Sequence, residues 1–318
     1  MKEKSGSTLT RLEPRRSKGA RLRKRLLESW PWYLMALIPI IYTIIFDYAS
    51  MYGIVMAFQD YKASKGFFGS KFVAFKHFER FFKFPGFKKM MINTLRISLL
   101  SLSTFPCSII FALFLDEIMQ KKFKKTAQMI TYMPHFMSEV IVCALVVMLL
   151  DTGIGPIAKI IEFLTGQKYD TMADPDAFPW VYVLSGLWKN LGWGSILYLS
   201  GLASVSSEEI EAARIDGASR FQTMWHIKLP AIVPSIAISL IMRFGNLFNV
   251  GFQKIMLLQN DLTRDVSEVL GTYIYYVGLG GAQYSYAAAI GLVNNVMNLV
   301  IILIANRICK KLTSVGLV

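Results

Sequence analysis

The sequence predicts an all-α, polytopic membrane protein with six transmembrane helices. Of its 318 residues, 54% are hydrophobic, which exceeds the roughly 45–50% apolar content of soluble domains. The apolar residues gather into six runs of about 20 residues or more, the length that a helix needs to cross the hydrocarbon core. Barrel strands would be about half as long and would alternate in polarity. Because backbone groups in lipid must be bonded within their own segment, runs of this length are expected to be helical.

Charged and aromatic residues mark the ends of these runs. Ten basic residues lie within positions 1–29, and Trp30, Trp32 and Tyr33 open the first run. Basic flanks are typical of cytoplasmic loops, and tryptophan and tyrosine of the membrane interface. The six predicted spans are residues 31–57, 92–115, 127–150, 179–202, 231–257 and 285–307. We therefore expect a basic cytoplasmic tail at 1–29, a six-helix transmembrane domain at 30–310 and a cytoplasmic tail at 311–318.

Six crossings place both termini on one side of the membrane. The basic loop at 116–125 and the loop at 203–230 then share the cytoplasm, whereas the nearly neutral or acidic loops at 151–178 and 258–284 lie outside. The lysine-rich loop at 59–90 departs from this rule because the same topology places it outside. Its phenylalanines recur at spacings of three and four, which predicts an amphipathic helix in the outer interface. They are Phe72, Phe75, Phe78, Phe81 and Phe82.

The polar loop at 203–230 has the signals of two short helices. Ser206 and Ser207 are good N-cap residues, and two glutamates follow where a helix N-terminus favours acids. Gly217 is a plausible end of the first helix. A second helical stretch is expected from about residue 218 to 228, and Pro230 is tolerated in the first turn of the next span. The loop is predicted to be a helix–turn–helix parallel to the membrane.

The order of residues within this loop is more specific than its helical signals. Glu211-Ala212-Ala213, Asp216-Gly217-Ala218 and Ile227-Lys228-Leu229-Pro230 follow one another in order. This pattern resembles the EAA loop of importer-type ABC transporter permeases. Further stretches, at 51–61, 186–193, 249–252 and 284–287, resemble the carbohydrate branch with a maltose-type core. Within that branch they resemble the oligosaccharide permeases of the lipoprotein or aldouronate-transport type.

The resemblance implies a type I ABC importer permease fold in the plasma membrane, and a transport role rather than an enzymatic one. It implies three kinds of protein partner, which are a second homologous permease subunit, two ATPase subunits and an extracellular solute-binding lipoprotein. Membrane lipid is a further partner. ATP and Mg would be bound by the ATPase subunits and no cofactor by this chain. The loop would act as a coupling helix for ATP-driven, alternating-access import of an oligosaccharide. The ATPase-docking residues implied are Glu208, Glu211, Ala212, Ala213, Asp216, Gly217, Ala218, Leu229 and Pro230.

Ionisable residues within the predicted spans are a second set of candidates. Placing Glu139, Lys189 or Arg243 in lipid would cost about 2.5–3.5 kcal/mol each, so such residues face the bundle interior or a watered cavity. Two interpretations stay open: Glu139 pairs structurally with Lys189 or Arg243, or these residues line a translocation path.

Amide and aromatic side chains cluster in the later spans. A sugar site needs neutral hydrogen-bonding groups for hydroxyls and aromatic faces for the C–H faces of the ring. The alternative is hydrogen bonding between helices, which membrane bundles use freely. For the set as a whole we expect a polar cavity at mid-membrane. The candidate path residues are Glu139, Trp188, Asn190, Trp193, Asn246, Asn249, Gln253, Asn294 and Asn298.

Other functional classes lack their signatures. The positive charge is concentrated at the membrane flanks, which argues against nucleic acid as a partner. The sequence has no GxxxxGKS/T phosphate loop, no HExxH metal pair and no GxSxG nucleophile elbow. Two alternatives to an oligosaccharide importer remain at this stage. One is an ion-coupled secondary transporter with Glu139 or Asp47 as a proton relay, and the other is an ABC importer for a non-sugar solute such as a peptide.

Overall fold

The computed structural model describes the backbone of residues 18–313 and the side chains of residues 29–311. The chain divides into two compact units, Met1–Gly53 and Ile54–Val318. The predicted tails at 1–29 and 311–318 fall largely outside the described residues.

The described residues of the first unit form one long helix. It consists of α1 (Lys18–Thr43), a π-helical turn η1 (Ile44–Tyr48) and α2 (Ala49–Met51). From Ser29 this helix continues to Phe58 as a segment long and apolar enough to cross a membrane. None of the residues in that segment's most apolar window is buried. A helix whose side chains are apolar and exposed on all sides suits a lipid environment.

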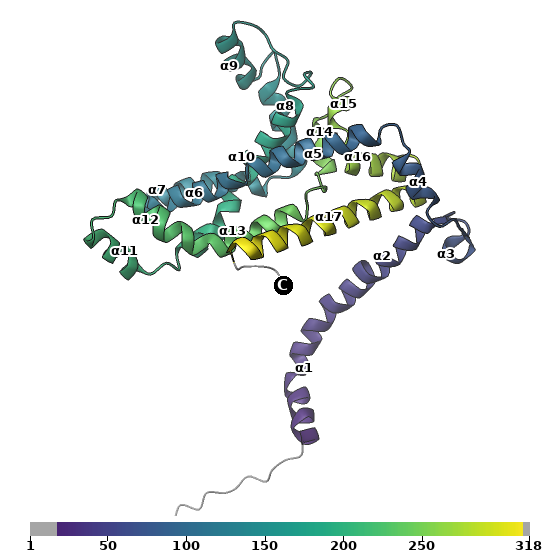
Figure 1. Cartoon of the computed structure of the whole chain (residues 1–318), viewed down its shortest axis with the longest axis horizontal. Helices are drawn as coiled ribbons and strands as arrows, with labels where there is room; N and C mark the ends of the chain where they lie inside the picture. The colour runs from purple at the N-terminus through teal and green to yellow at the C-terminus, as the bar shows by residue number, and fades with distance from the viewer. Residues whose placement is uncertain (1–17, 314–318) are drawn as a thin grey trace, which may run out of the picture. The chain divides into compact units, whose positions relative to one another are not determined.

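The second unit is a helical bundle (Figure 1), and it contains a small two-stranded β-ribbon. Its long helices are α5 (Phe87–Ser103) with α6 (Phe105–Glu117), α10 (Phe178–Leu202), α13 (Leu229–Phe244) and α17 (Tyr284–Thr313). The packing is closest between α10 and α6 and between α13 and α17. One core cluster joins α6, α10 and α13 through Ala112, Tyr198 and Ile232. The fold is therefore helical, as the sequence predicts.

The segment before α5 contains the only strands in the described part of the chain. The 3-10 turn η2 (Tyr52–Phe58) leads into β1 (Gln59–Asp60), α3 (Gly66–Gly69), β2 (Lys71–Phe72) and α4 (Lys76–Phe82). The strands pair antiparallel, with Gln59 opposite Phe72. The prediction of one amphipathic helix carrying all the phenylalanines is wrong. Phe72 lies on a strand, and Phe81 is fully buried against Met90 and Tyr286.

Six uniform spans are not confirmed, because two of the predicted spans are broken. The segment 127–150 bends by 105° between α7–η3 (Lys121–Phe136) and α8 (Glu139–Leu150). Pro134 and the N-cap of Ser138, which accepts a hydrogen bond from Ile141 N–H at 3.3 Å, start a new helix there. The segment 231–257 stops at Phe244 and resumes as α14 (Phe252–Leu258).

Four helices in the described residues are long and apolar enough to cross a membrane, or five if the bent pair counts as one span. They are Ser29–Phe58, Phe87–Glu117, Arg220–Phe244 and Tyr284–Lys311. The predicted span 179–202 is a continuous helix, α10, with Lys189 and Asn190 near its middle.

Short helices fill the connections. They are α9 (Pro156–Thr165), α11 (Ser207–Ile215), α12 (Arg220–Thr223), α15 (Arg264–Ser267) and α16 (Leu270–Tyr275), with π-helical turns η4 (Met224–Lys228) and η5 (Tyr276–Gly280). Figure 1 shows α11 and α12 at one end of the bundle and α4 and α16 at the other.

Candidate functional site: a coupling surface and a charged cavity

The loop at 203–230 folds as its local signals require. Ser206 caps α11 by accepting a hydrogen bond from the Glu208 N–H at 3.2 Å. Glu208 and Glu209 occupy the first turn, where their charge favours the helix N-terminus. The predicted N-cap is thus confirmed. No residue of α11 is buried, so most of its surface is free to meet another protein.

Gly217 makes the turn between the two short helices. Its φ of +82° lies in the left-handed region, which only glycine adopts without strain. A Cβ built there would meet nothing within 4 Å, so the requirement for glycine is conformational rather than one of space. The Ala218 N–H donates to the Ala213 carbonyl at 2.9 Å, which closes the end of α11. Ser219 and Gln222 then form a capping box that starts α12.

The second helix of the loop does not end before the next span. Residues Arg220–Phe244 form one continuous helix of 25 residues. The π-helical turn η4 lies just before Pro230, and Leu229 N–H donates to the Met224 carbonyl. A π-turn of this kind accommodates a residue that has no N–H, so the proline does not break the helix. The coupling loop is thereby joined rigidly to the span.

Most of the predicted docking residues lie on the surface. Glu208, Glu211, Ala212, Asp216, Gly217 and Pro230 are exposed, and Ala213 and Ala218 are partly buried. Leu229 instead packs against the core cluster of α6, α10 and α13. Sequence reasoning missed the large apolar side chains beside them: Ile215 is 86% exposed, and Phe221 and Trp225 stack at 6.2 Å between ring centroids. Their spacing of four in a polar loop was the available signal. We call α11 and the exposed residues of α12 and η4 the coupling surface.

A buried lysine ties this surface to the neighbouring span. Lys228 Nζ lies 2.8 Å from Asp116 Oδ2 and 2.5 Å from Glu117 Oε1, at the end of α6. Its side chain is only 10% exposed. Lys124 lies farther from the same carboxylate, at 3.5 Å from Asp116 Oδ1. We call Lys228, Asp116 and Glu117 the clamp, because their ion pairs join the end of α6 to the helix 220–244.

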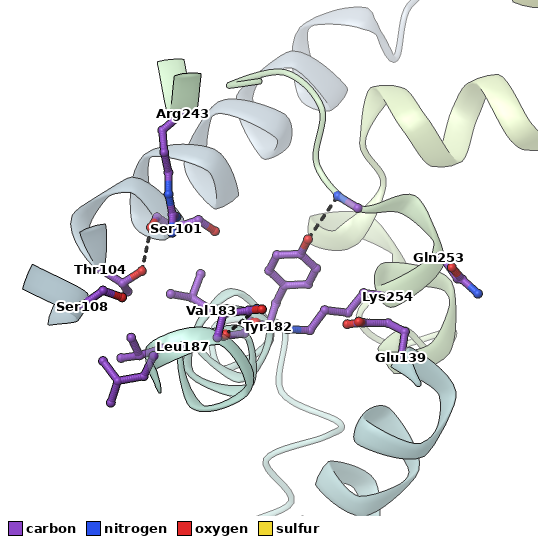
Figure 2. A pocket seen from close by; sticks show the side chains of 14 residues that line it. Ser101, Thr104, Ser108, Glu139, Tyr182, Val183, Leu187, Arg243, Gln253 and Lys254 are labelled. Atoms are coloured by element: carbon purple, nitrogen blue, oxygen red, sulfur yellow. Dashed lines mark hydrogen bonds between the residues drawn. The ribbon is translucent and has the colours of Figure 1, made fainter. Parts of the chain in front are cut away.

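Two adjoining cavities of about 390 Å³ each lie among the helices and share Ser101, Tyr182 and Arg243 in their walls. Glu139, Asn190 and Gln253 line the first, together with Lys254, Thr104 and Ser108 (Figure 2). Asn246 and Asn249 line the second. Five of the nine predicted path residues therefore line these two adjoining cavities.

The other four predicted path residues lie elsewhere. Trp188 lines a separate, mostly apolar cavity beside α8 and α9. Trp193 lines a small cavity with Phe105 and Arg243 and stacks on His135 at 4.4 Å between ring centroids. Asn294 and Asn298 are buried in α17.

These two asparagines hold the broken span in place. Asn294 and Asn298 both donate to Asn249 Oδ1, at 2.8 and 3.1 Å. Asn298 Oδ1 accepts the Phe248 N–H at 3.0 Å. The open backbone between α13 and α14 is thus bonded by side chains, as irregular backbone at membrane depth requires. Hydrogen bonding between helices accounts for both residues, and their contact with a substrate stays a prediction.

Positive charge predominates around the first cavity. Glu139 forms an ion pair with Lys189, which confirms one of the two pairings left open. Lys254 is buried, and its Nζ donates to the Tyr182 carbonyl at 2.7 Å. Arg243 is exposed in the cavity wall and has an aromatic neighbour, Phe105, 5.8 Å from its guanidinium carbon. Among the residues that line this cavity, Arg243 and Lys254 are basic and Glu139, which also pairs with Lys189, is the one acid. Sequence reasoning missed Lys254 because it fell at the edge of a predicted span.

Residues 104–314 match the family described as "Binding-protein-dependent transport system inner membrane component". The chain belongs to this family. It is 40% identical over 293 residues to Protein LplB of Bacillus subtilis (strain 168), covering 92% of both chains. It is also 40% identical over 304 residues to the polygalacturonan/rhamnogalacturonan transport system permease protein YteP of the same organism, covering 95% of both.

Solved structures agree with this assignment. One chain of a bacterial alginate ABC transporter, solved with an alginate pentasaccharide-bound periplasmic protein, is 38% identical, with a TM-score of 0.83. The match covers 93% of this chain and 100% of that one. This protein is therefore a membrane-spanning permease of an ABC importer that depends on a binding protein, and it is not an enzyme.

Proposed function

We propose that this permease imports an acidic oligosaccharide, delivered by an extracellular solute-binding lipoprotein. The observation that carries the proposal is the excess of cations at the first cavity. Glu139 is the one carboxylate among the lining residues and already forms an ion pair with Lys189, so the basic groups of Arg243 and Lys254 outnumber the acidic groups of the wall. Charge at membrane depth is costly unless it is matched, so a wall of this kind suits an anionic guest. A guanidinium group also matches the geometry of a carboxylate.

The remaining wall suits the rest of a sugar. Ser101, Thr104, Ser108 and Asn190 offer hydroxyl and amide groups for sugar hydroxyls. The names of two relatives support the acidic class: one transports polygalacturonan and rhamnogalacturonan, and another is involved in the import of the acidic polysaccharide alginate. A peptide importer remains the alternative within the family. Family membership favours ATP-driven import over the ion-coupled transporter.

The coupling surface is the proposed dock for a separate ATPase subunit. The helix 220–244 begins in this surface and carries Arg243 near its other end. At 1.5 Å per residue it is a rod of roughly 37 Å. The clamp also connects it to α6, whose residue Ser108 lines the cavity. A displacement of the dock would therefore move two walls of the cavity together.

This arrangement explains how a remote nucleotide site could change access to the cavity. The ATPase must bind the coupling surface more tightly in one state of the permease than in the other, because equal affinity would shift nothing. The proposed assembly has a second homologous permease subunit and two ATPase subunits, which bind ATP and Mg. Both termini of this chain are proposed to be cytoplasmic, on the side of the coupling surface.

The proposal is tested by replacing Arg243 with glutamine. A hydrogen bond to a charged group contributes about 1.5–3 kcal/mol, so the KM for an acidic oligosaccharide should rise about 10- to 150-fold. Uptake of a labelled oligogalacturonate is measured in proteoliposomes that contain the whole transporter and its binding protein. The control is Arg307→Gln, an exposed arginine in α17 that lies outside the coupling surface and both cavities. An unchanged KM in Arg243→Gln, or equal competition by a neutral oligosaccharide of the same length, would refute the acidic class.

A further inference from the structure

Residues 59–86 form a small folded module between two membrane helices. The helix Ser29–Phe58 precedes it and the helix Phe87–Glu117 follows it. The second of these has 31 residues and is roughly 46 Å long, slightly more than the full bilayer with its headgroups. Its first end carries the module, and its last residues, Asp116 and Glu117, belong to the clamp. The module therefore meets the membrane surface opposite the coupling surface.

The module has a core of its own, and it also exposes phenylalanine. Phe58 packs against Phe75 and Phe78, with ring centroids 5.8 and 5.3 Å apart. By contrast, Phe68 is 95% exposed and Phe72 is 66% exposed. An apolar ring that stays in water does not gain the favourable free energy of burial. We therefore expect these two rings to lie against a non-aqueous surface.

Lysines lie among these exposed rings. Lys76, Lys83 and Lys89 pair with Asp60, Glu79 and Asp265. A second group has exposed side chains and forms no ion pair with a carboxylate in the described part of the chain; it comprises Lys62, Lys65 and Lys71 in the module and Lys88 in the first turn of α5. The module thus presents unmatched positive charge and apolar rings on one short segment.

Exposed phenylalanines beside unpaired lysines favour a membrane surface over a protein as the partner of this module. Protein interfaces are depleted in lysine, whereas segments that lie in the membrane interface combine lysine with phenylalanine. Since the chain leaves and re-enters the bilayer within 28 residues, the module cannot be far from the headgroups. We propose that residues 59–86 are a binding site for acidic phospholipids, with Phe68 and Phe72 inserted between headgroups. Lys62, Lys65 and Lys71 of the module would lie on their phosphates, together with Lys88 in the first turn of α5.

The proposal accounts for the lysine-rich loop that departs from the charge rule. It also predicts a lipid requirement that is independent of the transported solute, because the module is separate from the cavity. Two experiments test it, one for insertion of the rings and one for the charge of the lipid.

Insertion is measured with a spin label at Phe68→Cys in the full transporter, after Cys107, Cys143 and Cys309 are replaced by alanine. In vesicles of phosphatidylglycerol and phosphatidylcholine, without binding protein, the label should be more accessible to oxygen than to a water-soluble nickel complex. The control is a label at Asp261→Cys, an exposed position in the turn before α15 and outside the coupling surface, which should show the reverse. A water-accessible label at position 68, or one protected only after binding protein is added, would overturn the proposal.

Lipid charge is tested with Lys65→Gln/Lys71→Gln. The control pair is Lys159→Gln/Lys168→Gln, two exposed lysines outside the module. Native mass spectrometry of the purified transporter counts the retained phosphatidylglycerol. At the usual contribution of a lysine near an anionic surface, the first pair should lower this retention by about tenfold or more, and the control pair should not. Equal retention by the two variants would contradict the proposal.

Discussion

Replacing Lys228 with methionine should disconnect the coupling surface from α6 and destabilise the permease. The ammonium group lies 2.8 Å from Asp116 and 2.5 Å from Glu117, whose side chains are only 22% and 25% exposed. Removing one partner of a buried ion pair costs about 3–5 kcal/mol. Because both carboxylates keep some contact with water and Lys124 stays near Asp116, we expect about 2–3 kcal/mol here. That corresponds to a fall of roughly 4–12 °C in the unfolding midpoint.

The assay combines thermal unfolding of the purified permease with ATP-driven uptake by the whole transporter. Lys124→Met is the matched control, because its Nζ lies 3.5 Å from the same carboxylate and its side chain is 29% exposed. It should cost at most about 1 kcal/mol. Lys228→Met/Asp116→Asn/Glu117→Gln removes the unpaired charges, so it should recover most of the stability while uptake stays low. Wild-type stability and uptake in Lys228→Met would refute the role of the clamp.

Three further predictions concern the coupling surface and the broken span. Glu211→Lys should abolish uptake while expression and membrane insertion stay intact, measured by transport and by membrane yield; normal uptake would remove the docking assignment. Gly217→Ala should cost about 1–2 kcal/mol from its φ of +82°, and Gly217→Pro should abolish uptake, whereas Gly280→Ala, in open space without a positive φ, should be neutral. Asn249→Ala should remove the acceptor of the Asn294 and Asn298 Nδ2 groups, at about 1–3 kcal/mol for each buried donor in thermal unfolding; an unchanged midpoint would argue against the asparagine cluster.

The coupling loop was predictable because its structure depends on neighbouring residues. The Ser206 cap, the glutamates after it and the glycine turn all act within a few positions, and the structure has each of them. The continuity of the helix through Pro230 was not predictable, because it depends on a π-helical turn that cannot be recognised from the residue pattern.

The breaks in the spans were hidden for a different reason. Apolar content predicts how long a span is, but not whether its helix is continuous. The helix predicted at 231–257 is interrupted where Asn294 and Asn298, about 50 residues away in the sequence, donate hydrogen bonds to Asn249. The same holds for Lys228 and Lys254, whose partners lie on other helices. A partner for Glu139 was predictable because a charge at membrane depth needs a counter-ion; the sequence left Lys189 and Arg243 as candidates, and the structure shows the pair with Lys189.

The central claim is that a cation-lined cavity, moved by the helix that begins in the coupling surface, imports an acidic oligosaccharide. It is tested most directly by uptake into proteoliposomes that hold both permeases, the ATPase subunits and the binding protein. ATP is supplied on the side of the membrane that carries the ATPase subunits. We predict uptake of a labelled oligogalacturonate. Unlabelled acidic oligosaccharides should inhibit this uptake, and neutral oligosaccharides of equal length should not. Uptake that needs no ATPase subunit, or that prefers the neutral oligosaccharide, would contradict the account.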